Sequence, residues 1–245
     1  LEALTLAAVV AVLVRALRPS HGSQASELGT LSVTRLDRHL DRLAATLNDA
    51  TAPPKQLKKA RKARRKAERT ESGQDTPRVF ILTFKGDIRA SQSSALRHEI
   101  SAVIGAHRPG DSVLLKLESP GGSVTGYGLA ASQLVRLRDA KIPLTVSVDQ
   151  VAASGGYMMA CVADEVIAAP FAIVGSIGVV STIPNVNRAL KAAHIDVEML
   201  TAGEFKRTLT VVGENTEEGR QKAQEQIDEI HELFKRFVTR YRSQV

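Results

Sequence analysis

The chain has few of the residues that build disulfide-linked, aromatic-rich or metal-binding domains. Its 245 residues include one cysteine, Cys161, no tryptophan and only 4% aromatic residues. A single cysteine excludes an internal disulfide and a cysteine-rich metal site. The sequence also has no His-Glu-x-x-His zinc motif, no phosphate-binding Gly-x-x-x-x-Gly-Lys loop and no internal repeat. We therefore expect no metal and no cofactor, and a core built from aliphatic side chains.

Positive charge is concentrated in the first third of the chain. Residues 1–78 hold 15 Lys or Arg and 8 Asp or Glu, whereas residues 79–245 hold 18 of each. The formal net charge of +7 therefore comes entirely from the first third. This distribution predicts a basic N-terminal region followed by a compact domain that begins near Arg78.

Residues 1–17 are almost entirely apolar between Glu2 and Arg15, and no small-residue cleavage site follows them. This pattern is more typical of the end of a membrane anchor than of a signal peptide. A buried core helix is the alternative, but the residues that follow are too polar to cover one. We expect an incomplete anchor, because a bilayer span needs about 20 residues.

Residues 18–77 are expected to form a stalk helix, a basic arm and a linker. The stalk is predicted from leucines that lie mostly at helical spacing, which place one apolar stripe on a helix suited to a stalk or to self-association: Leu28, Leu36, Leu40, Leu43 and Leu47. Residues 55–69 then carry nine basic residues and one acid, Glu68. The basic arm is either a solvated helix or a contact for anionic lipid or nucleic acid. Beside a membrane anchor, lipid ranks above nucleic acid.

From Arg78 onward, apolar strands alternate with amphipathic helices. The predicted strands are residues 79–84, 113–117, 144–148, 165–168 and 196–200, and the predicted helices are residues 93–104, 129–137, 158–163, 185–193 and a long helix capped by Thr216. This alternation predicts an α/β domain in which crossover helices wrap a parallel sheet. Sites in such sheets form at the carboxyl ends of the strands.

Two glycine-rich segments fall at expected strand ends. They are Ser119-Pro120-Gly121-Gly122 and Ala153-Ser154-Gly155-Gly156. Ser154 lies between residues that are too small to bury its hydroxyl, and glycines permit a sharp turn with an N–H directed at a bound group. An ordinary tight turn would produce the same motif. The coincidence of both segments at one edge of the sheet favours an active-site serine.

A serine hydroxyl needs a neighbouring base to act as a nucleophile. His194, with Asp196 close by, offers one candidate, and Lys206 in a polar loop offers the other. A lysine amine has a reference pKa of about 10.4, so a base working near pH 7.5 needs a shift of about three units, or about 4 kcal/mol. An exposed, charged lysine is the alternative. Cys161 is a poor candidate nucleophile because its helix is expected to be buried.

Several segments, in one order and spacing, resemble the signal peptide peptidase A family of membrane-bound serine endopeptidases, most closely its SohB-like branch. The matching segments are residues 118–122, 127–134, 149–164, 169–180, 201–208 and 213–220. The resemblance implies a fold of the Clp-protease/crotonase type. It makes residues 78–245 the peptidase domain, without the further C-terminal segment that family members usually carry.

The resemblance also implies a Ser-Lys dyad. Ser154 corresponds to the nucleophile, Lys206 to its base, and Ser176 to the serine that orients the lysine amine. The backbone N–H groups of Gly121 and Gly155 correspond to the donors that hold the oxyanion.

The partners implied by the resemblance are a peptide or protein substrate and further copies of the chain, because relatives assemble so that neighbouring subunits shape the cleft. It implies a single-pass anchor in the lipid bilayer of the bacterial inner membrane and a periplasmic catalytic domain, whereas the positive-inside rule places the basic arm in the cytoplasm. Nucleic acid is not expected as a partner. Two other functions stay open: crotonase-like acyl-CoA chemistry, which does not need Ser154, and a non-catalytic membrane scaffold.

Overall fold

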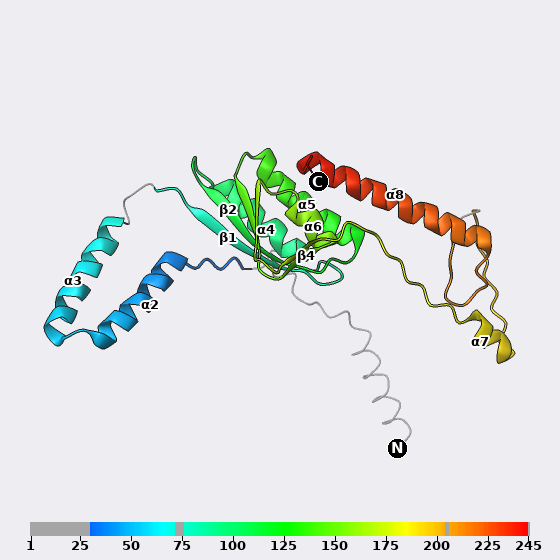
Figure 1. The fold of residues 1–245 in the computed structure, drawn as a ribbon, viewed down its shortest axis with the longest axis horizontal. Helices are drawn as coiled ribbons and strands as arrows, with labels where there is room; N and C mark the ends of the chain where they lie inside the picture. The colour runs from blue at the N-terminus through cyan, green and yellow to red at the C-terminus, as the bar shows by residue number, and fades with distance from the viewer. Residues whose placement is uncertain (1–29, 72–75, 204–205, 245) are drawn as a thin grey trace, which may run out of the picture. The chain divides into compact units, whose positions relative to one another are not determined.

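The computed structural model describes residues 30–71, 76–203 and 206–244, and contacts divide the chain into two compact units, Leu1–Thr70 and Glu71–Val245 (Figure 1). The expected anchor, residues 1–17, lies outside the described residues. Within the described ranges, no helix is both long enough and apolar enough to cross a membrane.

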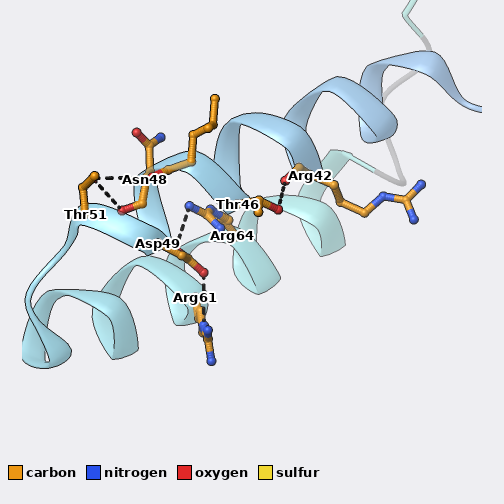
Figure 2. A network of polar contacts seen from close by, with 8 residues as sticks. Arg42, Thr46, Asn48, Asp49, Thr51, Arg61 and Arg64 are labelled. Atoms are coloured by element: carbon orange, nitrogen blue, oxygen red, sulfur yellow. Dashed lines mark hydrogen bonds and ion pairs between the residues drawn. The ribbon is translucent and has the colours of Figure 1, made fainter.

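The first unit contains a helical hairpin in which α2 (Leu36–Thr51) is followed by α3 (Pro54–Glu71). Asp49 on α2 joins the two helices, because its carboxylate accepts from Arg61 and Arg64 on α3 at 3.3 Å each (Figure 2). The predicted stalk helix and basic arm are therefore both helical. The stripe of leucines on α2 is exposed, with Leu47 at 73%, because the hairpin packs through other faces of its helices.

The second unit is built on a four-stranded parallel sheet in the order β1-β2-β3-β5. Its strands are β1 (Val79–Lys85), β2 (Ser112–Glu118), β3 (Leu144–Val148) and β5 (Glu165–Ala168). The connecting helices are α4 (Ser93–Ala106) between β1 and β2, α5 (Val124–Asp139) between β2 and β3, and the short α6 (Gly155–Ala160) before β5. A second, two-stranded parallel sheet pairs β4 (Val151–Ala153) with β6 (Ile173–Gly175).

The described helices bury one face of the four-stranded sheet. Alternate side chains of the strands, such as Phe84, Leu115 and Val146, join side chains of α4, α5 and α6 in one apolar core. The intervening side chains, among them Lys116 and Thr145, lie exposed or half-buried on the opposite face. The expectation of a sheet wrapped by helices therefore holds for one face of the described sheet. The physical reason lies in the central strands β2 and β3, which place the polar Lys116, Thr145 and Ser147 on that face, as is typical of a half-exposed strand. The outer strands β1 and β5 expose apolar side chains there, namely Val79, Ile81 and Ile167.

Beyond β6 the prediction and the structure differ. Residues 196–200 form no strand, and the apolar Leu200 is 94% exposed, because no neighbouring strand accepts their backbone hydrogen bonds in the described part of the chain. The helix predicted over residues 185–193 is the shorter α7 (Asn187–Ala192). The long helix is α8 (Glu217–Tyr241), and the hydroxyl of Thr216 caps it by accepting from the Gly219 N–H at 3.0 Å, as predicted.

The C-terminal half of α8 packs on the core of the second unit. Phe234 and Val238 are buried there, and the Arg242 guanidinium beyond the helix donates to the Ala163 carbonyl at 2.7 Å. At the other end of α8, a Cβ on Gly219 would lie 2.4 Å from the Thr208 carbonyl oxygen, so the preceding loop rests on the first turn of the helix.

Asp111 ties the start of β1 to the start of β2. Its carboxylate accepts from the Arg78 N–H at 2.7 Å, the Arg78 guanidinium at 2.6 Å and the Arg108 N–H at 2.9 Å. The residue is only 2% exposed. The hydrogen-bonded Arg78 guanidinium holds the pKa of Asp111 well below its usual range. The folded state therefore favours the charged carboxylate.

We expect Asp111→Asn to lower the urea midpoint of unfolding at pH 7, measured by circular dichroism. Because the pKa of Asp111 is lowered by folding, its contribution is complete above the unfolded pKa of about 3.9 and is lost as pH falls below that value. The difference between wild type and variant should therefore shrink from pH 4 downward. Asp149→Asn, which removes an exposed ion pair to Lys116, is the control and should change little. A difference that stays constant down to pH 2 would contradict this assignment.

Candidate active site

Ser154 has a strained backbone at the turn between β4 and α6. Its dihedral angles are φ 50° and ψ −116°, a combination that residues with a Cβ rarely adopt. The Ser154 N–H donates to the Gly175 carbonyl at 2.8 Å, which ties the turn to β6. A serine on a strained turn between a strand and a helix is also the arrangement of nucleophilic serines in α/β hydrolases. The side chain is half-buried, so its hydroxyl is accessible.

The loop after β2 contacts this turn through Gly121. A Cβ on Gly121 would lie 2.7 Å from the Ser154 Cβ and 2.9 Å from the Gly155 nitrogen, and the residue has φ +93°. Both the close approach and the dihedral require glycine. The Gly121 N–H donates to the Ser119 hydroxyl at 3.1 Å. An oxyanion bound at this amide would have to share that hydrogen.

Gly155 is the first residue of α6, so its N–H has no acceptor within the helix. A Cβ on Gly155 would lie 2.4 Å from the ring carbon Cγ of Tyr127, which is fully buried. Glycine at this position lets the start of α6 rest against the Tyr127 ring. The Gly155 amide is thereby fixed beside Ser154.

Ser176 is brought to the same place by strand pairing. Ala153 pairs with Gly175 in the β4–β6 ladder. Ser154 directly follows Ala153, and Ser176 directly follows Gly175. Ser176 has φ 56° and its side chain is exposed. The fold therefore brings Gly121, Ser154, Gly155 and Ser176 together, as expected for one site.

Lys206 lies in the exposed loop between α7 and α8. Asn185 holds this loop by donating to the carbonyls of Thr210 and Gly213 at 2.8 and 2.9 Å. In the part of the chain that the structure describes, no hydrogen bond or ion pair links the Lys206 amine to Ser154 or Ser176. A single chain therefore presents the serine and the expected base on separate segments.

The other candidate groups have no contact with Ser154. His194 and Asp196 are both exposed in the segment after α7, and no described hydrogen bond joins either one to the serine. Cys161 is completely buried at the end of α6, and burial raises the pKa of its thiol to about 12. A thiol with a raised pKa is a poor nucleophile.

Ser119 and Tyr127 also belong to this region, although the sequence alone does not single them out. Both are fully buried, and their hydroxyl oxygens lie 2.5 Å apart beside Gly121 and Gly155. The only sequence signal is a polar residue at the end of a buried strand and a hydroxyl on the apolar face of the next helix.

The family assignment rests on sequence comparison. A family model for the N-terminal region of peptidase family S49 matches residues 1–134, and the model for peptidase family S49 matches residues 136–245. The chain belongs to peptidase family S49. It is accordingly a serine peptidase, a hydrolase that acts on peptide bonds.

Curated S49 relatives include proteins named SohB. The chain is 47% identical to the probable protease SohB of Haemophilus influenzae over 99% of its own length and 72% of the relative. It is 58% identical to the probable protease SohB of Buchnera aphidicola from Schlechtendalia chinensis over 67% of its own length and 54% of that relative. The named relatives are bacterial proteases, and the chain spans between about half and three quarters of their length.

A membrane-bound stomatin-specific protease is similar among solved structures. It aligns with 46% of this chain and 49% of its own, at 20% identity and a TM-score of 0.36. The similarity between the two structures is therefore low.

We expect Gly155→Ala to destabilise the second unit by about 1–3 kcal/mol, because its methyl group would overlap a ring that cannot move out of the core. Gly128→Ala, on α5, is the matched control. No atom lies near its Cβ position, so it should stabilise the helix by about 0.5–1 kcal/mol. Urea unfolding followed by circular dichroism measures both, and equal effects of the two substitutions would contradict the packing of α6 on Tyr127.

Proposed function

We propose that this S49 peptidase is a membrane-anchored endopeptidase that cleaves peptides or membrane-associated proteins, signal peptides among them, with a Ser154–Lys206 dyad. Ser154 attacks the peptide carbonyl, Lys206 accepts the serine proton, and Ser176 orients the lysine amine. The Gly155 N–H, together with the Gly121 N–H, stabilises the oxyanion. The fold proposed for the domain is of the Clp-protease/crotonase type.

The observation that carries the proposal is the strained Ser154 turn against the Gly121 loop. Strain at a residue with φ 50° persists only where surrounding structure imposes it, and it is common at catalytic residues. Here the Gly175 carbonyl and the Gly121 backbone both hold the turn. Without a function for Ser154, a substitution in this turn could remove the strain and stabilise the fold.

A homo-oligomer is part of the proposal. Residues 171–212 expose large apolar side chains, with Phe171 at 98% and Leu200 at 94%. Exposed apolar side chains gathered on one segment mark an interaction surface. Packing of this segment against a second copy would cover it and would take the Lys206 loop out of water.

The proposed membrane location is supported by the apolar residues 1–17 and the basic helix α3. The proposal places the anchor in the bacterial inner membrane and the catalytic unit in the periplasm. An anionic lipid surface beside the anchor would attract the cationic α3.

We expect Ser154→Ala and Lys206→Met to abolish cleavage of an unfolded protein substrate by the full-length protein in detergent. Each variant should lose at least about 10³-fold in kcat, because neither half of a dyad works alone. Gel analysis of substrate cleavage over time compares both variants with wild type.

Matched controls are Ser181→Ala and Lys191→Met, which change the same residue types on the segment after β6. Lys191 pairs with Glu214 at 2.8 Å on the surface, so its loss should alter stability little. Full activity in Ser154→Ala would overturn the peptidase mechanism and favour acyl-CoA chemistry or a scaffold. Full activity in Lys206→Met alone would overturn the dyad while leaving the serine in place.

We expect Phe171→Ser combined with Leu200→Ser to reduce the oligomeric mass, measured by analytical ultracentrifugation in detergent. Removing two almost fully exposed apolar side chains weakens an interface that buries them. Leu47→Ser, on the exposed stripe of α2, is the comparison. If only Leu47→Ser reduces the mass, the copies associate through α2 and the assignment to residues 171–212 is wrong.

A further inference from the structure

We propose that Ser119 and Tyr127 are positioning residues, which hold the Gly121 loop against Ser154 through a directed chain of hydrogen bonds. The inference rests on the proposed function, because it assigns a role to two residues that support the same serine site. Neither residue touches the reacting atoms. Their effect is exerted through Gly121, Gly155 and the strand that carries Ser154.

The direction of the chain follows from its contacts. The Tyr127 hydroxyl donates to the Asp87 carbonyl at 2.8 Å, so its single hydrogen is used there. The Ser119 hydroxyl, 2.5 Å away, must then donate to the Tyr127 oxygen. The Ser119 oxygen accepts from the Gly121 N–H at 3.1 Å. The hydrogens therefore all point one way, from the Gly121 amide to Asp87, and such chains strengthen each member.

Burial keeps this chain intact. Ser119 and Tyr127 are both fully buried, so water cannot replace a lost partner. Burial also raises the pKa of Tyr127, which keeps its hydroxyl protonated and able to donate. The acceptor is fixed as well, because the Asp87 carboxylate accepts from the Arg89 and Ser91 N–H groups at 3.1 and 2.9 Å and shapes its own turn.

Ser119 connects the chain of hydroxyls directly to the strand that carries the nucleophile. Its N–H donates to the Val151 carbonyl at 2.8 Å, and its carbonyl accepts from the Ala153 N–H at 3.0 Å. The same residue therefore holds β4 with its backbone and the Gly121 loop with its side chain. The Tyr127 ring supports the other side of the site, because Gly155 rests on it.

The consequence for catalysis is a fixed distance between the loop and the serine. A Cβ placed on Gly121 would lie 2.7 Å from the Ser154 Cβ, so the two backbones are in close contact. Without the Ser119 hydroxyl, the Gly121 amide loses its acceptor, and the loop is held mainly by the Ser123 N–H, which donates to the Ile88 carbonyl at 2.7 Å. A displacement of about 1 Å at a reacting centre reduces rates by about 10²-fold.

The test uses Ser119→Ala and Tyr127→Phe in the full-length protein. For each variant, kcat per active site and KM are measured on a fluorogenic peptide, with active sites counted by covalent titration. Affinity is measured for a peptide boronic acid, which forms a tetrahedral adduct with the serine, and for the same peptide without the boronic acid. We expect kcat per site and boronate affinity to fall together by about 10- to 100-fold. KM and affinity for the plain peptide should stay within about twofold.

A double variant separates one connected chain from two independent hydroxyls. Because either substitution breaks the same chain, Ser119→Ala with Tyr127→Phe should lose no more than the worse single variant. If the losses of the two single variants add in the double variant, the two hydroxyls act independently and the proposed chain of hydrogen bonds is wrong. Matched controls are Tyr241→Phe on α8, where the ring stacks under Arg138, and Ser93→Ala, whose buried hydroxyl donates to the Ala90 carbonyl at 2.6 Å. Both should keep full kcat per site.

The outcomes distinguish this inference from the proposed function. In one outcome, Ser154→Ala is inactive while Ser119→Ala and Tyr127→Phe keep full kcat per site and full boronate affinity. That result would overturn the positioning role and leave the peptidase mechanism in place. If Ser119→Ala and Tyr127→Phe only unfold more easily, the number of active sites falls while kcat per site does not. The role of the two residues is then structural only. If Ser154→Ala remains active, the proposed function itself fails.

Discussion

The close approach of two backbone turns, the Gly121 loop and the Ser154 turn, is the constraint on which the rest of the catalytic unit depends. It requires glycine at position 121, because any Cβ there would overlap Ser154. It also requires that β2 and β4 end at the same edge, which the Ser119–Ala152 bridge ensures. The parallel sheet supplies that edge, and the one-sided helix layer supplies a rigid base beneath it. The sheet and its helix layer thus set the position of Ser154 by fixing where β2 and β4 end.

Local sequence pattern was sufficient for the part of the fold that is held by local contacts. The apolar alternation of β1, β2 and β3 and the hydroxyl cap at Thr216 are both visible in short windows, and the structure confirms them. The strand predicted over residues 196–200 was wrong, because a strand needs a partner and apolar periodicity does not report one. The open face of the sheet differs from the prediction of a sheet wrapped by helices. Polar residues at alternate positions of β2 and β3, such as Lys116 and Ser147, indicate that face, but the strands are short and the rest of their residues are mostly apolar.

The supporting network could not be predicted, because it joins residues that are distant in sequence. Tyr127 and Asp87 are 40 positions apart, and neither type is unusual in its local context. Ser154 stands out in the sequence because small residues gather around it, and it stays a prediction as the nucleophile. The buried hydroxyls of Ser119 and Tyr127 are marked only by the partners that satisfy them. Such supporting residues are therefore found from contacts that the sequence does not display.

In the described part of the chain Ser154 and Lys206 share no hydrogen bond, and the segment that carries the lysine finds little apolar surface to pack on. Within residues 171–212 only Ala172 and Ile177 pack against the apolar core of the described chain, and side chains such as Phe171, Val180 and Leu200 stay in water. Covering these exposed apolar side chains with a second copy of the chain would contribute favourable free energy. Under the proposed mechanism, the same packing step would exclude water from the Lys206 loop, which would couple activity to assembly.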